Sequence, residues 1–400
     1  MRVVLVISVV ALAACGGGDH HGTGGGAGGG SAQTSLDLND VSWLFPLPDW
    51  DHRDQLLGLD DSGAQGALLP RALYDQLVKL VPDQELSDTH DRIKIVSVRV
   101  DPCFPATVPP AAPACARQIR LVAQPVISHA QLASLGSNQL STDDATIHLF
   151  YTLDAATFGT LVDDLYALKM KAGDDTRGPL AVHPVMKSQG LDGDYAKALK
   201  ALILKYAGDA TLTRIAEMNV QAFSDQDKRT GFVWSFVMFD RSGSALTHEE
   251  IARVEADAQG VQQAGTDASR AGSLNPSPPN DDFETLMTTT DTAQADDYTL
   301  ESAFKSALTF ENPNRSSPRA VDCGSCHAAS RSRTAAELQR NMDTSSYAER
   351  FDDSAFDLRR VDQTPTDPHT LRAFGYFFDQ TAFSQRTIND SAVTARALSR

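Results

Sequence analysis

Apolar and polar residues alternate along three segments in the first half of the chain. These segments are 92–100 (RIKIVSVRV), 117–126 (RQIRLVAQPV) and 145–153 (ATIHLFYTL). An alternation with a period of two residues puts the apolar side chains on one face of an extended chain, and it therefore predicts half-buried β-strands. Two longer strands are expected at 213–223 and 230–240, on either side of the turn sequence SDQDKR.

Between these strands, and again toward the C-terminus, apolar residues recur with the helical period. Asp154 is expected to cap a helix that runs to Lys171 and carries its apolar residues along one face. A second helix is expected at 194–208. Further helices are expected at 74–81, 298–310 and 384–400. This mixture of strands and helices predicts an α+β fold.

The periodic segments fall into two groups separated by a polar stretch. Residues 256–282 are rich in Gly, Ser and Pro and poor in large apolar residues, which favours a linker. We therefore expect an α+β domain at 35–255, with a mixed sheet and helices, and a small, mainly α-helical domain at 283–400. A chain of 400 residues is long enough for two such domains.

The first 34 residues have no globular pattern. Residues 1–15 consist of a short start with Arg2, an apolar run of 12 residues and a final cysteine, Cys15. Such a run is too short to span a bilayer, which takes about 20 residues, and has the length of a signal-peptide core. Its ending, Leu-Ala-Ala-Cys, resembles the lipobox of bacterial lipoproteins, which implies cleavage before Cys15 and lipidation of its thiol. The glycine-rich residues 16–34 are expected to be a flexible tether.

The residue after Cys15 is Gly16 and not Asp, and the sorting pattern of that family then implies the outer membrane. Several acyl chains make an anchor stable, so we expect an outer-membrane lipoprotein of the cell envelope, on the periplasmic or the surface face. An ordinary cleaved signal peptide is the alternative. The formal net charge of −17, with no basic stripe, argues against nucleic acid as a partner.

Four cysteines remain beside Cys15, in two local pairs. Cys103 and Cys115 flank a proline-rich loop between two of the predicted strands. Outside the cytoplasm, such a pair is typical of a structural disulfide. The surrounding domain resembles a set of uncharacterised bacterial lipoproteins that share the sequence DPCFP, a resemblance that implies no activity. Cys323 and Cys326 are then left for each other or for a cofactor.

Cys323 and Cys326 belong to the sequence VDCGSCHAA, a C-x-x-C-H motif that His327 completes. With two residues between them on a helical turn, both thiols reach the vinyl groups on one edge of a porphyrin, and the next residue reaches the iron. Random placement of 5 Cys and 10 His in 400 residues gives roughly 0.002 such motifs, so coincidence is a weak explanation. On this motif, residues 298–400 resemble the c-type cytochromes.

The resemblance implies one covalent haem c, held by Cys323 and Cys326, with His327 as the proximal iron ligand. In the small cytochromes c, a methionine several tens of residues beyond the motif is usually the distal ligand. Here Met342 follows His327 by only 15 residues, and His369 follows it by 42 residues in a proline-flanked loop. His369, Met342 and an open iron therefore remain alternatives. Seven aromatic residues within 351–383 fit either the wall of a haem slot or the core of a small domain.

Three other interpretations of the motif stay open. CGSC also resembles the redox motif of thioredoxins, although the acidic Asp322 beside Cys323 disfavours the thiolate that this chemistry needs. A structural disulfide is the second alternative. A zinc site, which needs two further ligands, is the third.

The sequence as a whole predicts a membrane-anchored mono-haem protein that transfers single electrons to a redox protein partner. An open iron would permit haem peroxidase chemistry instead, and a disulfide at the motif would leave a non-catalytic binding lipoprotein. The isolated histidines His148 and His183 are expected to be ordinary core or loop residues. The chain contains no GxSxG, P-loop or HExxH motif.

Overall fold

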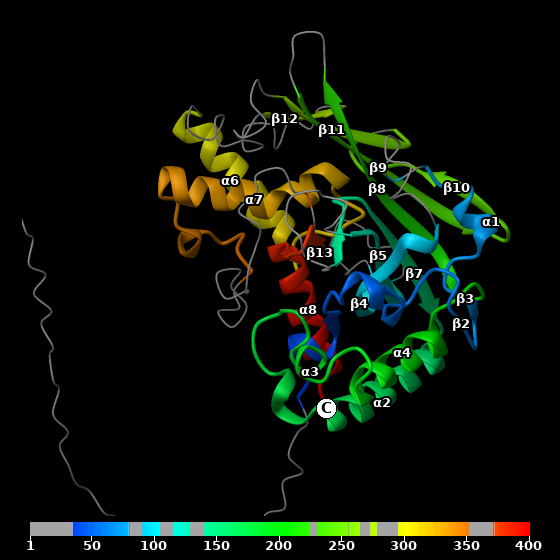
Figure 1. Ribbon diagram of the computed structural model, residues 1–400. Coiled ribbons are helices and arrows are strands. Elements are labelled where there is room, and N and C mark those ends of the chain that lie inside the picture. Colours follow the sequence, from blue (N-terminus) through cyan, green and yellow to red (C-terminus); the bar gives the residue numbers. More distant parts are fainter. Residues whose placement is uncertain are drawn as a thin grey trace, which may run out of the picture. The chain divides into compact units, whose positions relative to one another are not determined.

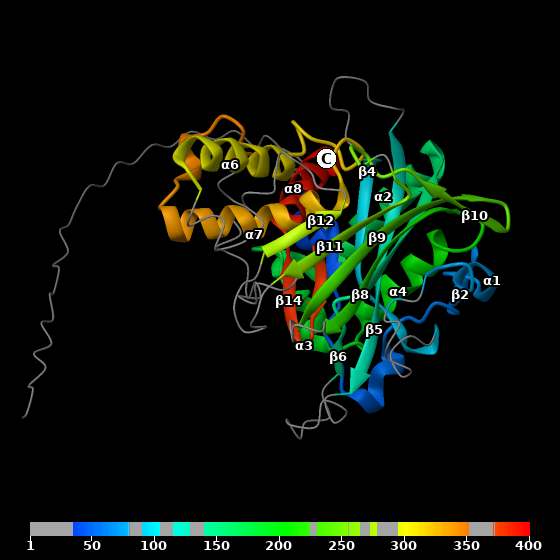
Figure 2. The same cartoon turned by 90° about the horizontal axis from the view of Figure 1, so that it is seen from above.

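The computed structural model describes residues 35–78, 80, 90–104, 115–128, 140–224, 230–254, 256–264, 273–277, 295–351, 371 and 373–400. Within these residues the protein is a mixed α+β structure built on one large antiparallel sheet (Figures 1 and 2). Ser35–Arg400 form one compact unit. The expected signal segment, Cys15 and the glycine-rich tether lie outside the described residues.

Ten of the described strands form the main sheet. Their order is β1-β4-β5-β7-β8-β9-β11-β12, with β6 paired to β5 and β10 paired to β9. Their bounds are β1 Ser42–Leu44, β4 Ile93–Phe104, β5 Ala116–Ser128, β6 Leu140–Thr142, β7 Thr146–Leu153, β8 Leu212–Ser224, β9 Thr230–Ser242, β10 Ala245–Glu249, β11 Ala258–Ala264 and β12 Ser273–Ser277. The five strands expected from alternation correspond to β4, β5, β7, β8 and β9, so the two-residue period is confirmed. Two short hairpins stand apart: β2 Ser62–Gly63 with β3 Gly66–Ala67, and β13 Phe374–Phe377 with β14 Gln380–Phe383.

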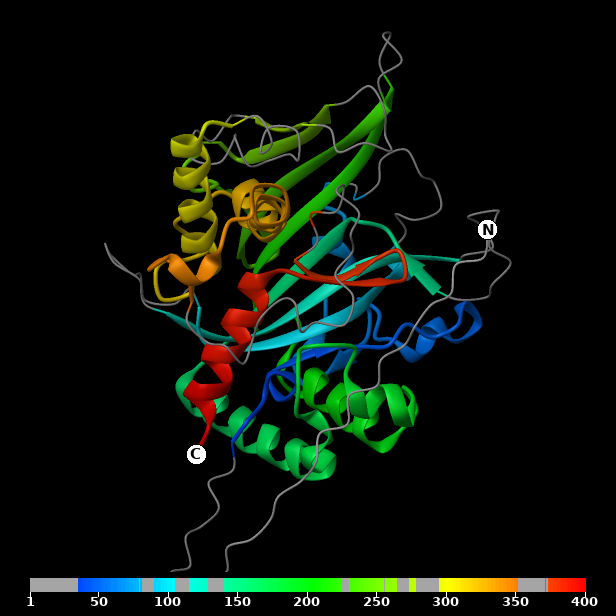
Figure 3. The same ribbon diagram turned by 90° about the vertical axis from the view of Figure 1, so that its left-hand side faces the viewer.

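Helices cover both faces of the main sheet (Figure 3). They are α1 Arg71–Tyr74, α2 Ala155–Ala172, α3 Pro184–Gln189, α4 Asp194–Tyr206, α6 Asp297–Glu311, α7 Cys323–Arg340 and α8 Gln385–Leu398. Short 3₁₀ helices are η1 Leu38–Asp40, η2 Trp50–Gln55, η3 His90–Arg92, η5 Gly173–Thr176 and η7 Thr344–Ser346. No helix in the described part of the chain combines the length and the apolar character that crossing a bilayer requires.

Most of the expected helices are present, and one is not. Asp154 caps α2 as predicted, because its Oδ1 accepts a hydrogen bond from the Thr157 amide at 2.8 Å. The prediction of a helix at 74–81 is wrong, because α1 ends at Tyr74 and a turn follows it. α1 buries a single side chain, Leu73, which is too little apolar contact to extend it.

The first face of the sheet is apolar and closed. It is formed by alternate strand residues such as Leu121, Leu149 and Ile215, all 0% exposed. Residues of α2 and α4, including Leu161 and Leu199, complete the same core cluster. Full burial of one such side chain stabilises the fold by about 1.5–3 kcal/mol, so this face holds most of the apolar core.

The second face carries the side chains that alternate with these, among them Arg120, His148, Met218 and Phe236. Helices α6 and α7 pack over its β8, β9 and β11 part. Helix α8 and the β13–β14 hairpin pack over its β1, β4 and β5 part. The C-terminal helices thus form a third layer on the sheet.

The domain organisation differs from the expectation in two ways. The segment 256–282, expected as a linker, contains β11 and β12, which extend the main sheet beyond β9. An edge strand is held by backbone hydrogen bonds and needs few large apolar side chains, so composition alone suggested a linker. The described helices of 283–400 do not stand apart as a domain, because they cover the second face and belong to the same compact unit.

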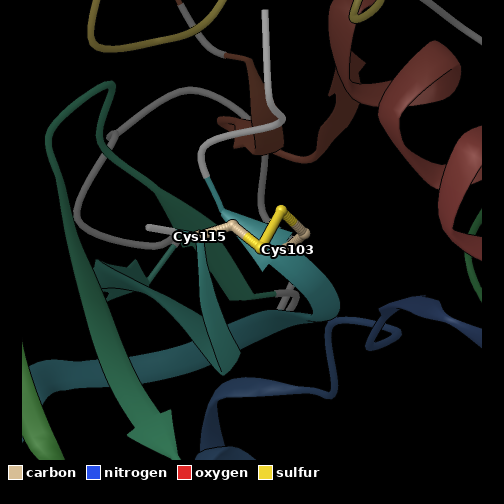
Figure 4. The surroundings of a disulfide bond; sticks show 2 residues. All are labelled: Cys103 and Cys115. Atoms are coloured by element: carbon tan, nitrogen blue, oxygen red, sulfur yellow. A yellow bond between two sulfur atoms is a disulfide. The ribbon is translucent and has the colours of Figure 1, made fainter. Parts of the chain in front are cut away.

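The expected disulfide between Cys103 and Cys115 is present at the end of the β4–β5 hairpin (Figure 4). Their Cα atoms are 4.7 Å apart and the two residues are 12 positions apart in the sequence. A disulfide that closes a loop of this size stabilises a fold by about 3 kcal/mol. This cysteine pair is therefore accounted for as a structural crosslink.

Candidate functional site

The C-x-x-C-H motif lies at the N-terminus of α7, in a turn that is held firmly against the sheet. Asp322 is the N-cap, and its Oδ2 accepts a hydrogen bond from the Ser325 amide at 2.9 Å. Gln259 of β11 donates its side-chain N–H to Asp322 Oδ2 at 2.7 Å and accepts from the Gly324 amide at 2.7 Å. Asp322 and Gln259 are both buried. The start of α7 is therefore fixed to β11 by a closed set of hydrogen bonds.

The first residue between the two cysteines is a glycine because α7 and β11 approach closely there. A Cβ atom on Gly324 would lie 2.8 Å from Cγ2 of Val261 and 3.2 Å from Oε1 of Gln259. Any larger residue would push the helix away from the strand. Since Gly324 faces β11, the helical period turns Cys326 to nearly the opposite side of α7.

Cys323 and Cys326 are not joined in a disulfide, and both residues are half-buried. Burial raises the pKa of the Cys323 thiol, and the neighbouring Cys326, Asp322 and Glu249 raise it further. Burial also raises the pKa of Cys326, although the guanidinium of Arg386 acts in the opposite direction. Both groups are therefore neutral thiols at neutral pH. A cysteine that attacks disulfides needs the opposite, a lowered pKa.

The imidazole of His327 is oriented by a backbone carbonyl. Its Nδ1 lies 2.6 Å from the carbonyl oxygen of Leu371. A carbonyl oxygen only accepts, so this contact assigns the proton to Nδ1 and the lone pair to Nε2. The ring of Phe236 packs against the imidazole with a centroid distance of 4.9 Å. His327 is thus held in the tautomer in which histidines bind metals through Nε2.

These groups fit a covalently attached haem. Two neutral thiols lie one helical turn apart, and the next residue has its lone pair on Nε2. This is the donor set that thioether attachment and axial ligation require.

A cluster of charged side chains lies beside Cys326, between β4, β5 and α8. Its members are Arg99, Asp101, Arg120, Arg386 and Asp390. Arg99 donates to Asp101 at 2.7 Å and to Asp390 at 3.0 Å, and Arg386 donates to Asp390 at 2.8 Å. Arg99 and Arg120 face each other across β4 and β5. Burial and the nearby charge of Arg99 lower the pKa of Arg120 to about 10. Cys326 therefore lies near charges of both signs, with Arg386 and Arg120 opposed by Asp390 and Asp322.

The structure does not bring Met342 to His327. Helix α7 continues to Arg340, so Met342 follows its far end, about 20 Å along the helix axis from His327. There Met342 packs against a cluster on α6 that contains Leu300 and Phe304. His369 lies outside the described residues, so its role as a distal ligand stays a prediction.

Most of the described aromatic residues between 351 and 383 contribute to a core away from the motif. Phe374, Tyr376 and Phe383 join a core cluster with α8 and the first strands of the sheet. The aromatic residues beside α7 come instead from β9, namely Phe236 and Trp234. They lie about 90 residues before the motif, in a segment where the alternation of apolar and polar residues predicts a strand and gives no sign of a contact with the motif.

A zinc site at the cysteines needs further ligands. Among the described residues, the potential ligands that the fold brings together as a group of three lie elsewhere, in Asp60, His90 and Asp91. His90 Nδ1 is 3.2 Å from an Asp60 oxygen and 4.0 Å from an Asp91 oxygen, and both carboxylates are exposed. The arrangement is a buried imidazole beside two exposed carboxylates, and it gives the zinc interpretation of Cys323 and Cys326 no support.

The candidate site thus consists of the first turns of α7 together with the second face of the sheet beneath them. It is defined by the chemistry and geometry of this chain. No family model, curated protein or solved structure matches the sequence.

Proposed function

We propose that this protein is a c-type cytochrome of the cell envelope, which carries one covalent haem and transfers single electrons. The observation that carries the proposal is the donor set at the start of α7. Cys323 and Cys326 lie one turn apart without a disulfide between them, and the carbonyl of Leu371 orients His327.

In this proposal the residues of the chain have separate tasks. Cys323 and Cys326 hold the porphyrin by thioether bonds, and His327 binds the iron on the proximal side. The bound haem supplies a one-electron iron couple. Asp322 and Gln259 keep the motif in place against β11. Helices α6, α7 and α8 correspond to the expected cytochrome c-like domain, and they pack on the second face of the sheet.

The other interpretations of the motif have less support. The raised pKa values of both thiols disfavour a thiol–disulfide enzyme. A structural disulfide is present in the other cysteine pair and not in this one. Electron transfer needs no substrate pocket, which agrees with the lack of other catalytic motifs in the sequence.

We also propose that Cys15 is lipidated and anchors the protein to the outer membrane, where it meets a redox protein partner. The support is the lipobox-like sequence before Cys15 and the glycine-rich segment after it. Replacement of Cys15 by serine should release the protein into the soluble fraction. Continued sedimentation of the Cys15→Ser variant with membranes would contradict the anchor.

The haem proposal is tested on protein exported in a bacterium that matures c-type cytochromes. The intact mass should exceed the polypeptide mass by one haem, and the reduced protein should show the sharp α-band of a thioether-linked haem. The double variant Cys323→Ser/Cys326→Ser should lose both signals. The matched control is Cys103→Ser/Cys115→Ser, which removes the other cysteine pair and should keep the haem. A colourless wild-type protein, lighter by two hydrogens at Cys323 and Cys326, would refute the proposal.

A further inference from the structure

Several residues on the second face are partly exposed, although helices pack over this face. Among them are Arg120, His148, Ala216 and Met238. The strand residues that follow or precede them point to the first face and are almost completely buried, as for Leu149 and Ile215 at 0% exposed. The three residues of the motif, Cys323, Cys326 and His327, are partly exposed as well. Partial exposure is thus shared by the motif and by one patch of the sheet.

Three of these four sheet residues lie in one row across the strands. His148 of β7 is paired with Ala216 of β8, and Ala216 is paired with Met238 of β9. Neighbouring strands are about 5 Å apart, which places His148 and Met238 about 10 Å apart at the backbone. Ala216, the residue between them in the row, has only a methyl side chain. The middle of the row is therefore occupied by a small side chain, with the imidazole of His148 on one side of it.

The motif is close to the strands on both sides of His148. Cys326 is near enough to Arg120 of β5 for each group to influence the charge state of the other. Cys323 is similarly close to Glu249, which is paired with Met238 of β9. Strand β7 lies between β5 and β8, and β9 is the next strand beyond β8. His148 is therefore placed on the part of the sheet that the side of α7 carrying the cysteines approaches.

His327 of α7 contacts the second face near the row that contains His148. Its ring packs on Phe236, which lies on the second face of β9 two residues before Met238. Phe236 is paired with Met218 in the row next to that of His148. Across two strands and one row, the backbone positions of Phe236 and His148 are about 12 Å apart. His327 on α7 and His148 on β7 thus belong to neighbouring parts of the second face.

We propose that His148 is the distal axial ligand of the haem attached to Cys323, Cys326 and His327, an inference that rests on the proposed function. The iron then has two imidazole ligands, one from the C-terminal helix layer and one from the centre of the sheet. Two protein ligands leave no open coordination position, which suits electron transfer and not peroxide chemistry.

Three other described histidines have contacts away from α7, whereas the ring of His148 stacks on that of Phe150, on the same face of β7, with a centroid distance of 6.5 Å. His183 caps α3, with its Nε2 3.1 Å from the carbonyl oxygen of Asn39. His90 pairs with the exposed Asp60. His248 of β10 is exposed and packs on Phe239, a residue of the first-face core.

The test uses the full-length exported protein and reads the coordination of the iron by absorption and electron paramagnetic resonance. Wild type should be low-spin. His148→Ala should keep the covalent haem by mass, lose the low-spin signal, bind carbon monoxide, and recover the low-spin signal on addition of imidazole. His148→Met, which keeps the volume of the side chain, should stay folded and raise the midpoint potential, as a methionine ligand does. His248→Ala is the matched control and should behave as wild type.

The possible outcomes separate this inference from the proposed function. A wild-type protein without haem refutes the proposed function itself. Haem-containing protein whose low-spin signal and midpoint potential are unchanged in His148→Ala and His148→Met shows that His148 is not the ligand. A high-spin wild type would also overturn the inference, because it would show an iron without a distal protein ligand.

Discussion

The two faces of the main sheet are built from the same strands but differ in polarity and in exposure around the middle of β7. On β7, Ile147, Leu149 and Tyr151 point to the first face and are 0% exposed. The residue between the first two, His148, points to the second face and is partly exposed. At this position the strand thus contributes a buried apolar side chain to one face and a partly exposed imidazole to the other. Because successive side chains along a strand point to opposite faces, one face can stabilise the core while the other carries polar groups.

The second face also carries buried ion pairs. Arg99 is 2% exposed and is paired with both Asp101 and Asp390. A buried ion pair is often no more stabilising than apolar residues of the same volume, because both charges lose their hydration. Stability alone therefore does not explain such a cluster beside Cys326.

The largest expected difference between the faces concerns stability without haem. In the Cys323→Ser/Cys326→Ser background, Leu149→Ala should lower the free energy of unfolding by about 2–5 kcal/mol, because it leaves a cavity in a closed core. His148→Ala, at the adjacent position, should lower it by less than about 1 kcal/mol, since a partly exposed side chain leaves no such cavity.

Urea unfolding followed by circular dichroism measures both variants. Equal losses of stability at positions 148 and 149 would show that the second face is as tightly packed as the first. The contrast between the two faces would then be wrong.

A second prediction concerns the fixing of α7 to the sheet. Asp322 is a buried N-cap with two hydrogen bonds, so Asp322→Ala should cost about 2–3 kcal/mol and leave Gln259 without its acceptor. Asp296 caps α6 through the Thr299 amide in the same way but is exposed. Asp296→Ala should therefore have a smaller effect.

The measurement pairs the free energy of unfolding with the fraction of protein that carries haem. We expect Asp322→Ala to reduce both and Asp296→Ala to leave the haem content unchanged. If the two variants lose the same stability and the same haem, then the contact with β11 does not position the motif.

Local sequence signals predicted those parts of the fold that depend on local physics. The alternation in 145–153 identified β7, and the cap at Asp154 identified the start of α2, because both depend on residues close in sequence. Strands β11 and β12 were not predicted, since an edge strand is defined by its partner and not by its own composition. The docking of the C-terminal helices on the sheet was not predicted for the same reason.

The candidate site likewise has a part that the local sequence predicts and a part that depends on long-range packing. Cys323, Cys326 and His327 could be identified because they are adjacent in the sequence. His148 was expected to be an ordinary core or loop residue, since it lies 179 positions before His327 and no local pattern connects them. Only the pairing of β7 with β8 and of β8 with β9, together with the packing of α7 over β8 and β9, relates the two histidines in space.

The smallest expected effect is a pH dependence that arises from a histidine in the closed core. Burial lowers the pKa of His183 to about 3, whereas its ordinary value is 6.5. As the pH falls below 6.5, the unfolded chain takes up a proton at this residue and the folded protein does not. The unfolded state then binds more protons, so stability is complete above pH 6.5 and is lost progressively toward pH 3. At pH 5.5 the loss from this residue should be about 1.4 kcal/mol.

His183→Asn isolates this contribution, because asparagine also caps helices and does not titrate. The variant should be less stable than wild type at pH 7, since the imidazole N–H near the Asn39 carbonyl is lost. Its free energy of unfolding should fall less steeply than that of wild type between pH 7 and pH 5, by about one proton per molecule. Parallel curves for the two proteins would mean that His183 is not buried in its neutral form. The first face would then be less closed around Trp43 and Tyr195 than their packing indicates, and the contrast with the second face would weaken.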